Sequence, residues 1–155
     1  MNEVSNIISP ERVAADLGCA GKKALFQQLA LAGARATGLD QKAILSALVE
    51  REKLGSTGFG SGIAIPHGRV EGLPGIIGFF VRLSAPIDFQ SVDGLPVDLV
   101  FMLLSPPDAG AEHLKALAGV SRMLRDRAML AKLRGARTKD ALYALLAGVE
   151  ALDAA

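Results

Sequence analysis

Two apolar stretches near the middle of the chain constrain its fold more than any other feature. Residues 76–83 and 97–104 are rich in branched and aromatic side chains, a composition typical of strands buried in the centre of a sheet. A Pro86 break and an Asp93-Gly94 turn signal lie between them. Neither stretch approaches the roughly 20 apolar residues that a membrane span needs. We therefore expect two central strands joined by a loop, and no membrane insertion.

Helical patterns flank these strands in the sequence. Before them, a short helical turn at residues 9–11 and a weak strand over 13–19 precede two helices. The first helix runs from about residue 22 to Gly38, and the second begins at the N-cap residue Asp40 and ends at Gly55, which supplies a left-handed stop. After Pro106-Pro107, three further helices are expected over 114–124, 129–133 and 139–149, the last capped by Thr138.

The order of these elements predicts the fold class. With a short strand at residues 63–65, the order is β-α-α-β-β-β-α-α-α. Helices on both sides of the strands favour an α/β fold, a three-layer sandwich in which a mixed central sheet has helices on both faces. The 155 residues show no internal repeat or polar linker, so we expect a single domain over residues 1–155.

The overall charge and the cysteine content exclude some classes of protein. The formal net charge is +1, from 17 Lys and Arg against 16 Asp and Glu, so the chain lacks the basic field of a nucleic-acid-binding protein. The lone Cys19 cannot form an internal disulfide, and the N-terminus has no secretion signal. We expect a cytoplasmic protein that does not bind nucleic acid.

A glycine-rich segment ends at one of the chain's two histidines, His67. A neutral histidine is a good nucleophile near pH 7. Pro66 and Gly68 flank it and leave its ring approachable at a strand's end, where backbone amides of the glycine-rich run can face an anion. From the residues alone, a histidine that only fills a turn is an equally good interpretation.

The other candidates, His113 and Arg51, also have plain structural interpretations. His113 lies near the start of a predicted helix, where it is either a cap or surface residue or a second ring at the strand-end site. Arg51 closes the second helix, where a cation complements the helix dipole. If the glycine-rich loop folds back, the Arg51 guanidinium lies beside phosphoryl oxygens bound at the site.

Several other kinds of site are excluded by the sequence. Residues 55–61 lack the lysine of a P-loop, and residues 58–63 do not complete the dinucleotide-binding pattern. No serine has glycines two residues to either side, as a hydrolase nucleophile elbow requires. The only hint of a zinc site is His67 with Glu71, fewer ligands than zinc needs.

Taken together, these residues resemble the IIA component of the fructose/mannitol class of the phosphotransferase system, and most of all its nitrogen-regulatory members. The strongest element is Arg51-Glu52 followed by GSTGFGSGIAIPHGR at 55–69. Residues 96–101 (PVDLVF) and 112–114 (EHL) are similar to later family blocks. The first forty residues fit only by layout.

The resemblance implies a phosphotransferase component that acts by a phosphohistidine relay, not a free-standing metabolic enzyme. In this family His67 would take the phosphoryl group from a phosphohistidine on an HPr-like carrier, on the ring nitrogen remote from the backbone. His113 and Arg51 match the positions that steady the phosphoryl oxygens, and no metal or organic cofactor is implied. Regulatory targets would be sensor kinases, potassium transport proteins, or nitrogen and stringent-response proteins.

Two other functions stay open from the sequence. One is a soluble sugar-specific IIA component that passes phosphate to a separate fructose- or mannitol-type permease, and the other is a binding module in which phosphorylation is vestigial. An unprotonated nitrogen must carry out the attack, so the other nitrogen of His67 needs a hydrogen-bond acceptor. The sequence does not identify that acceptor.

Overall fold

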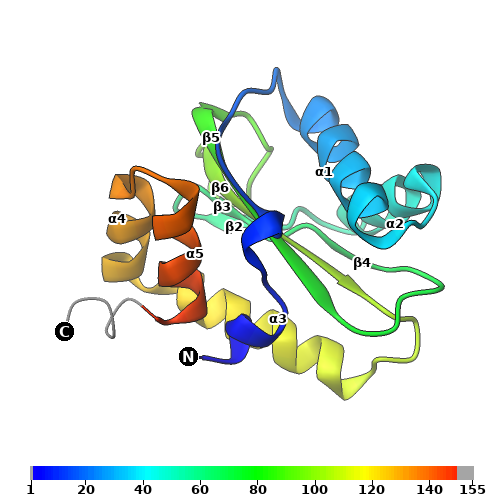
Figure 1. Ribbon diagram of the computed structural model, residues 1–155. Coiled ribbons are helices and arrows are strands. Elements are labelled where there is room, and N and C mark those ends of the chain that lie inside the picture. The colour runs from blue at the N-terminus through cyan, green and yellow to red at the C-terminus, as the bar shows by residue number, and fades with distance from the viewer. Residues whose placement is uncertain (1, 150–155) are drawn as a thin grey trace.

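The computed structural model describes residues 2–149, which form helices packed on a sheet (Figure 1). Two 3-10 turns, η1 (Glu3–Asn6) and η2 (Pro10–Arg12), come first. The strands are β1 (Val13–Leu17), β2 (Gly58–Gly60), β3 (Ile63–Ala64), β4 (His67–Arg69), β5 (Ile77–Ile87) and β6 (Val97–Ser105). The helices are α1 (Lys22–Thr37), α2 (Gln41–Lys53), α3 (Ala111–Arg125), α4 (Arg127–Gly135) and α5 (Lys139–Ala147).

The sheet is mixed, with β5 and β6 as an antiparallel pair at its centre. The strand order is β1-β5-β6-β3-β2, and β4 also pairs with β6. Strand β1 is parallel to β5, while β3 and β4 are both parallel to β6 and follow each other along one edge of it. Because β3 and β4 share this edge, the chain between them is held beside the C-terminal half of β6.

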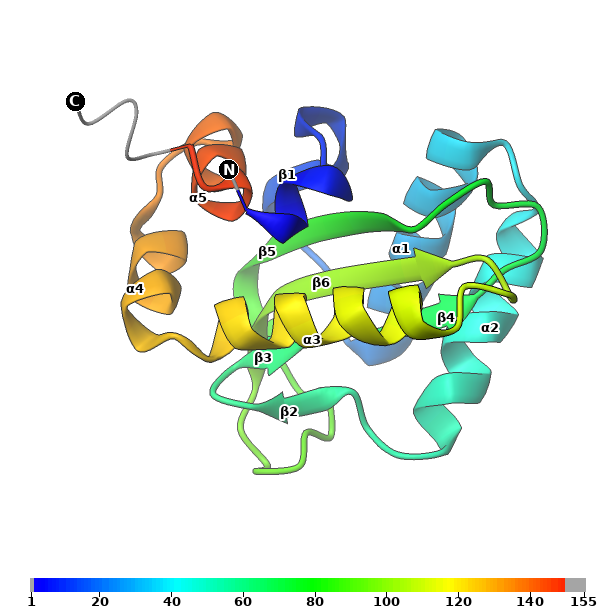
Figure 2. The same cartoon turned by 90° about the horizontal axis from the view of Figure 1, so that it is seen from below.

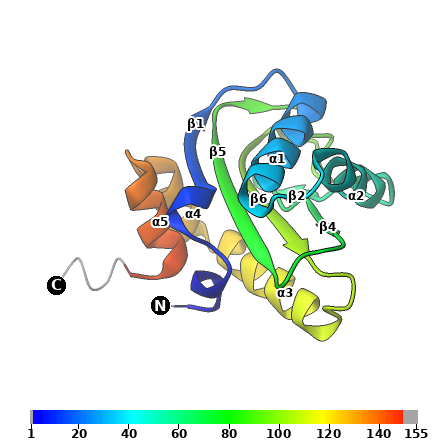
Figure 3. The ribbon, with the colours of Figure 1, turned by 45° about the vertical axis from the view of Figure 1, so that its right-hand side comes forward.

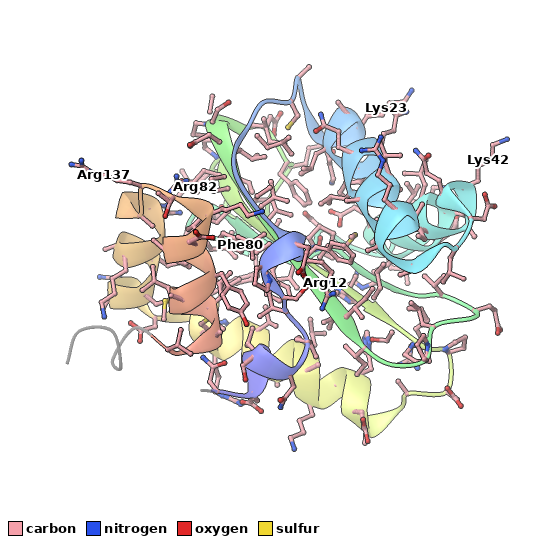
Figure 4. All side chains as sticks on the ribbon, viewed as in Figure 1. Arg12, Lys23, Lys42, Phe80, Arg82 and Arg137 are labelled. Carbon is pink, nitrogen blue, oxygen red and sulfur yellow. The ribbon has the colours of Figure 1, made fainter. Side chains whose placement is uncertain are left out.

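Alternate residues of β5 and β6 point to opposite faces of the sheet, as the pleat of a strand requires. Helices α1 and α2 cover one face, and α3, α4 and α5 cover the other (Figures 2 and 3). The buried side chains of β5 and β6 that pack toward α1 and α2 are Phe79, Val81, Leu83, Ile87, Val97, Val100, Met102 and Leu104. Those that pack toward α3, α4 and α5 are Phe80, Leu99, Phe101 and Leu103, and Figure 4 labels Phe80 beside α5.

The predicted α/β class, the mixed sheet and the helices on both faces are confirmed. Gly38 caps α1 in the left-handed conformation with φ 76°. The Asp40 side chain accepts a hydrogen bond from Lys42 N at 3.4 Å, and Thr138 accepts one from Ala141 N at 3.1 Å. Each cap satisfies a backbone group that has no partner within its helix.

The boundaries differ from the expectation in the glycine-rich segment. The expected strand at 63–65 is present as β3 (Ile63–Ala64), and two short strands that were not expected flank it. Gly58–Gly60 pairs antiparallel with β3, and His67–Arg69 resumes the pairing along β6. Gly55 is not a left-handed helical stop, because its φ is 152°. Helix α2 ends instead with two backbone hydrogen bonds, from the Leu54 amide to the Arg51 carbonyl and from the Gly55 amide to the Glu52 carbonyl.

Two other elements end earlier than expected. Strand β1 ends at Leu17 instead of residue 19, and α5 ends at Ala147 because Gly148 turns left-handed with φ 75°. Among residues 2–149, no helix is both long and apolar enough to cross a membrane.

Candidate functional site

The register of β4 on β6 fixes the position of His67. The carbonyl of Pro66 accepts a hydrogen bond from Leu103 N at 2.9 Å, and His67 then lies opposite Leu103 as the first residue of β4. The prediction that His67 lies at a strand's end therefore agrees with the structure, but the strand begins there instead of ending. Its ring is half-buried at the rim of the sheet, so it is neither in the core nor fully exposed.

The hydrogen bonds of the His67 ring define its tautomer. Nδ1 lies 2.8 Å from the carbonyl oxygen of Ile65. A carbonyl oxygen only accepts, so Nδ1 carries the hydrogen and Nε2 is unprotonated. Nε2 accepts a hydrogen bond from Nε–H of Arg51 at 3.1 Å. The acceptor that the sequence could not identify is thus the backbone of Ile65, two residues before the histidine.

Arg51 reaches His67 because α2 packs closely against β4. Its NH1 group donates to the Gly55 carbonyl at 2.8 Å, which ties the guanidinium to the loop after α2. Gly68, next to His67, is buried against Ala47 of α2. A Cβ at residue 68 would lie 3.0 Å from the Ala47 Cβ and 3.2 Å from its carbonyl carbon. Only glycine permits this approach without a shift of the helix or the strand.

His113 approaches from the other side of the sheet edge. It is the third residue of α3, is only 5% exposed, and has its Nδ1 2.6 Å from Oγ of Ser105. The centres of the His67 and His113 rings are 5.7 Å apart, and the ring planes are inclined at 50°. The structure therefore brings together all the predicted site residues, His67, His113 and Arg51, from β4, α3 and α2.

The surroundings keep both imidazoles neutral. Burial lowers the pKa of His67 below its ordinary value. The Ile65 carbonyl and Glu52 oppose this, while the positive charges of Arg51 and Arg69 lower the pKa of His67 further. Burial also lowers the pKa of His113, followed by the effects of Arg69 and His67. Both rings are therefore largely uncharged at neutral pH, with one hydrogen each.

The histidines line a groove of about 550 Å³. Its other lining residues are Ala47, Glu50, Arg51, Leu54, Gly68, Arg69, Leu114 and Leu117. Leu54 is 84% exposed and Leu114 is 64% exposed, which is unusual for large apolar side chains grouped around a polar centre. The groove thus combines nitrogen donors with an apolar rim suited to a protein partner.

Two charged residues of this site were not among the predicted site residues. Arg69, at the end of β4, lowers the pKa of both imidazoles, and its NH1 donates to the Pro107 carbonyl at 3.1 Å. Glu52 accepts from the amide and hydroxyl of Thr57, at 3.1 Å and 2.6 Å, and pairs with Lys22 at 2.8 Å. Glu52 therefore fastens the loop that follows Arg51. Both residues lie within the motif that carries the family resemblance, Arg51-Glu52 and residues 55–69, and this motif is the sequence signal that could have identified them.

The chemistry of the site is that of a nucleophilic nitrogen surrounded by donors. Nε2 of His67 has a free electron pair in the neutral ring, and a guanidinium and a second imidazole lie next to it. Such donors stabilise oxygens that carry negative charge during phosphoryl transfer. Within residues 2–149, no group of three or more His, Cys, Asp or Glu side chains is arranged to hold a metal ion.

Comparison with known proteins gives consistent matches over nearly the whole chain. Residues 6–149 match the family model described as phosphoenolpyruvate-dependent sugar phosphotransferase system, EIIA 2. A nitrogen regulatory protein of Bradyrhizobium diazoefficiens is 48% identical over 144 residues, 93% of this chain and 94% of the relative. One from Pseudomonas aeruginosa is 41% identical over 151 residues, 97% of this chain and 98% of the relative.

A solved structure extends the similarity to three dimensions. The crystal structure of nitrogen regulatory protein IIA-Ntr from Neisseria meningitidis superposes with a TM-score of 0.88 at 34% identity. The match covers 94% of this chain and 99% of that one. The similarity therefore includes the sheet, whose strand β4 carries His67, and both helical layers, of which α3 carries His113.

Proposed function

This chain belongs to the EIIA type 2 family of the phosphoenolpyruvate-dependent sugar phosphotransferase system, and on that premise we propose that it carries a phosphoryl group on Nε2 of His67. The observation that carries this proposal is the tautomer of His67. Its Nδ1–H is held by the Ile65 carbonyl, which leaves Nε2 unprotonated in the groove. A nucleophile must present an electron pair, and this ring presents one without losing a proton first.

The transfer step needs no proton to move. The donor is a phosphohistidine on an HPr-like carrier whose ring is protonated on its other nitrogen. The electron pair of His67 Nε2 forms a new N–P bond as the donor N–P bond breaks, and the donor ring leaves as a neutral imidazole. His67 then carries phosphate on Nε2 and hydrogen on Nδ1, still bonded to Ile65. This exchange of equivalent bonds fits a relay that works in both directions.

Arg51 and His113 stabilise the phosphoryl oxygens in this proposal. The Nε–H of Arg51 lies 3.1 Å from Nε2 of His67, so an entering phosphoryl group displaces this hydrogen bond and receives it on an oxygen. The His113 ring lies beside the His67 ring, with 5.7 Å between the ring centres, and Arg69 adds a second positive charge. Alignment and positive groups around three oxygens are what a loose phosphoryl-transfer transition state requires.

The role that we propose for this relay is regulatory. Relatives of nearly the same length are nitrogen regulatory proteins, and a phosphoryl group adds a charge of about −1.5 to −2 to the groove. That charge lies in the groove that the exposed Leu54 and Leu114 also line, so it changes which partner surface fits there. We expect an HPr-like carrier to dock on this rim in the cytoplasm, and sensor kinases or potassium transport proteins to distinguish the two forms.

Labelling tests the proposal directly. An HPr-like carrier phosphorylated with ³²P should label the wild-type chain and leave His67→Ala unlabelled. The matched control is His113→Ala, which removes the other imidazole but keeps the acceptor, and should be labelled more slowly. Equal labelling of His67→Ala and wild type would overturn the proposal.

The sugar-specific alternative makes a different prediction. A sugar-specific IIA component would pass its phosphate to a sugar in membranes that hold a fructose-type or mannitol-type permease. We expect the labelled chain to retain its phosphate in such membranes. Transfer to sugar at a rate comparable to transfer from the carrier would instead assign the chain to transport.

A further inference from the structure

A second buried side chain determines how His113 acts in this site. We propose that Ser105 is a positioning residue that holds His113 as the tautomer with its hydrogen on Nε2, so that His113 presents an N–H group to the phosphoryl oxygens. The functional part of this inference rests on the proposed phosphorylation of His67. The tautomer itself is a property of the unphosphorylated protein.

Ser105 connects the two elements that carry the histidines. It is the last residue of β6 and is fully buried. Its backbone pairs with Arg69 of β4, and its carbonyl accepts from Val70 N at 2.8 Å. Its Oγ lies 2.6 Å from Nδ1 of His113 on α3. The backbone of Ser105 thus fixes β4 while its side chain fixes the ring on α3.

His113 has only one ring hydrogen to place. Burial and the charge of Arg69 lower its pKa, and a position in the first turn of a helix also disfavours a positive charge. A neutral imidazole has one donor nitrogen and one acceptor nitrogen. The partner of Nδ1 therefore decides whether Nε2 carries a hydrogen or a bare electron pair.

The hydroxyl of Ser105 resolves this choice. Among the residues that the structure describes, His113 Nδ1 is the sole hydrogen-bond partner of Ser105 Oγ. If Nδ1 carried the hydrogen, the Ser105 hydroxyl would accept, and its own hydrogen would be buried without an acceptor. A buried donor left unsatisfied costs about 1–3 kcal/mol. When the hydroxyl donates to Nδ1 instead, both groups are satisfied and the hydrogen of His113 is on Nε2.

The two histidines then have opposite tautomers. His67 has hydrogen on Nδ1 and an electron pair on Nε2, because of the Ile65 carbonyl. His113 has an electron pair on Nδ1 and hydrogen on Nε2, because of the Ser105 hydroxyl. One ring supplies the nucleophile, and the other supplies a donor in the same groove. A bare Nε2 on His113 would instead repel the phosphoryl oxygens.

Long-range ¹H–¹⁵N NMR of the unphosphorylated protein tests the tautomers. In wild type we expect Nδ1–H for His67 and Nε2–H for His113. Ser105→Ala removes the donor and should move His113 toward Nδ1–H, with His67 unchanged. Ser105→Thr keeps a hydroxyl and should restore the Nε2–H form. The matched control is Ser91→Ala, because the Ser91 Oγ is buried and has no hydrogen-bond partner among residues 2–149.

The lifetime of the phosphohistidine tests the consequence. Loss of one ordered donor should speed hydrolysis in Ser105→Ala by about 2- to 10-fold, the range that the net worth of a hydrogen bond gives. Ser105→Thr and Ser91→Ala should hydrolyse like wild type. An Nδ1–H form of His113 in wild type, or an unchanged tautomer in a folded Ser105→Ala protein, would overturn this inference. Neither result affects the labelling of His67, so the two proposals fail separately.

Discussion

The contact between Gly68 and α2 gives the sharpest prediction about how the site is assembled. In Gly68→Ala, the new methyl carbon would lie 3.0 Å from the Ala47 Cβ and 3.3 Å from the Ala47 carbonyl oxygen. Carbon atoms pack best at about 3.5–4.0 Å, so α2 and β4 must separate by roughly 0.5 Å. Two of the three contacting atoms belong to the helix backbone, which cannot rotate away as a flexible side chain would.

This separation should affect stability and transfer together. Overpacking of this kind costs about 1–3 kcal/mol of unfolding free energy, and each kcal/mol lowers Tm by about 2–4 °C in a chain of this size. Arg51 is on α2 and His67 is next to Gly68 on β4, so their 3.1 Å contact lengthens as the elements part. A misplacement of about 1 Å can cost 100-fold in rate, and we expect a loss of about 10-fold or more.

The assays are thermal melting and the rate of labelling by the phosphorylated carrier. The matched control is Gly75→Ala, because a Cβ at Gly75 meets no atom within 4 Å in the part of the chain that the structure describes. Gly75→Ala should melt and transfer like wild type. If Gly68→Ala also behaved like wild type in both assays, the close packing of α2 on β4 would not be what positions Arg51 against His67.

Further variants test the electrostatics and the loops. Arg51→Gln should raise the pKa of His67, measured by NMR titration, because the guanidinium lowers it. The fold lowers the pKa of His67 from its ordinary value of 6.5, so the unfolded chain takes up this proton at a higher pH than the folded chain does. The free energy of unfolding should therefore decrease as the pH falls below about 6.5. The decrease should be less steep in His67→Gln. Glu52→Gln should cost about 1–3 kcal/mol in urea unfolding, since it weakens the buried bonds to Thr57. Gly62→Ala should cost a similar amount, about 1–3 kcal/mol, because φ is 82° there and a Cβ would lie 2.8 Å from a carboxylate oxygen of Asp98.

The sequence predicted the elements whose signals are local. The caps at Gly38, Asp40 and Thr138 depend on one residue and its nearest neighbours, and each is present in the structure. The two apolar stretches became β5 and β6 because branched and aromatic residues fill both faces of a covered strand. The sequence predicted only the class of fold. It did not predict which strands pair, or that α1 and α3 cover opposite faces of the sheet.

The glycine-rich segment shows where sequence reasoning stops. Glycines 58 and 60 weaken a strand signal, yet they form β2 because β3 offers an open edge to pair with. The hydrogen-bond partners of Nδ1 in the two histidine rings lie two and eight residues away in the sequence, yet the sequence does not identify them. Ser105 is a single polar residue at the end of an apolar stretch, and nothing in its spacing indicates a bond to His113. The sequence cannot single out the Ile65 carbonyl as an acceptor, because every residue has a backbone carbonyl.

The convergence of His67, His113 and Arg51 was expected from the family resemblance, while their separate positions in the sequence did not require it. Arg51 precedes His67 by 16 residues, yet its Nε–H lies 3.1 Å from the ring because α2 packs on β4. His113 reaches the same place from α3 on the other face of the sheet. Tertiary packing, not local propensity, makes this site.

The most direct test of the central claim is to identify the phosphorylated nitrogen. The chain, phosphorylated by an HPr-like carrier and labelled with ¹⁵N, should show phosphorus–nitrogen coupling at Nε2 of His67 by NMR, with Nδ1 still bearing hydrogen. The phosphate should also be labile in acid and stable in base. Phosphate on Nδ1 of His67, or on any other residue, would contradict the account.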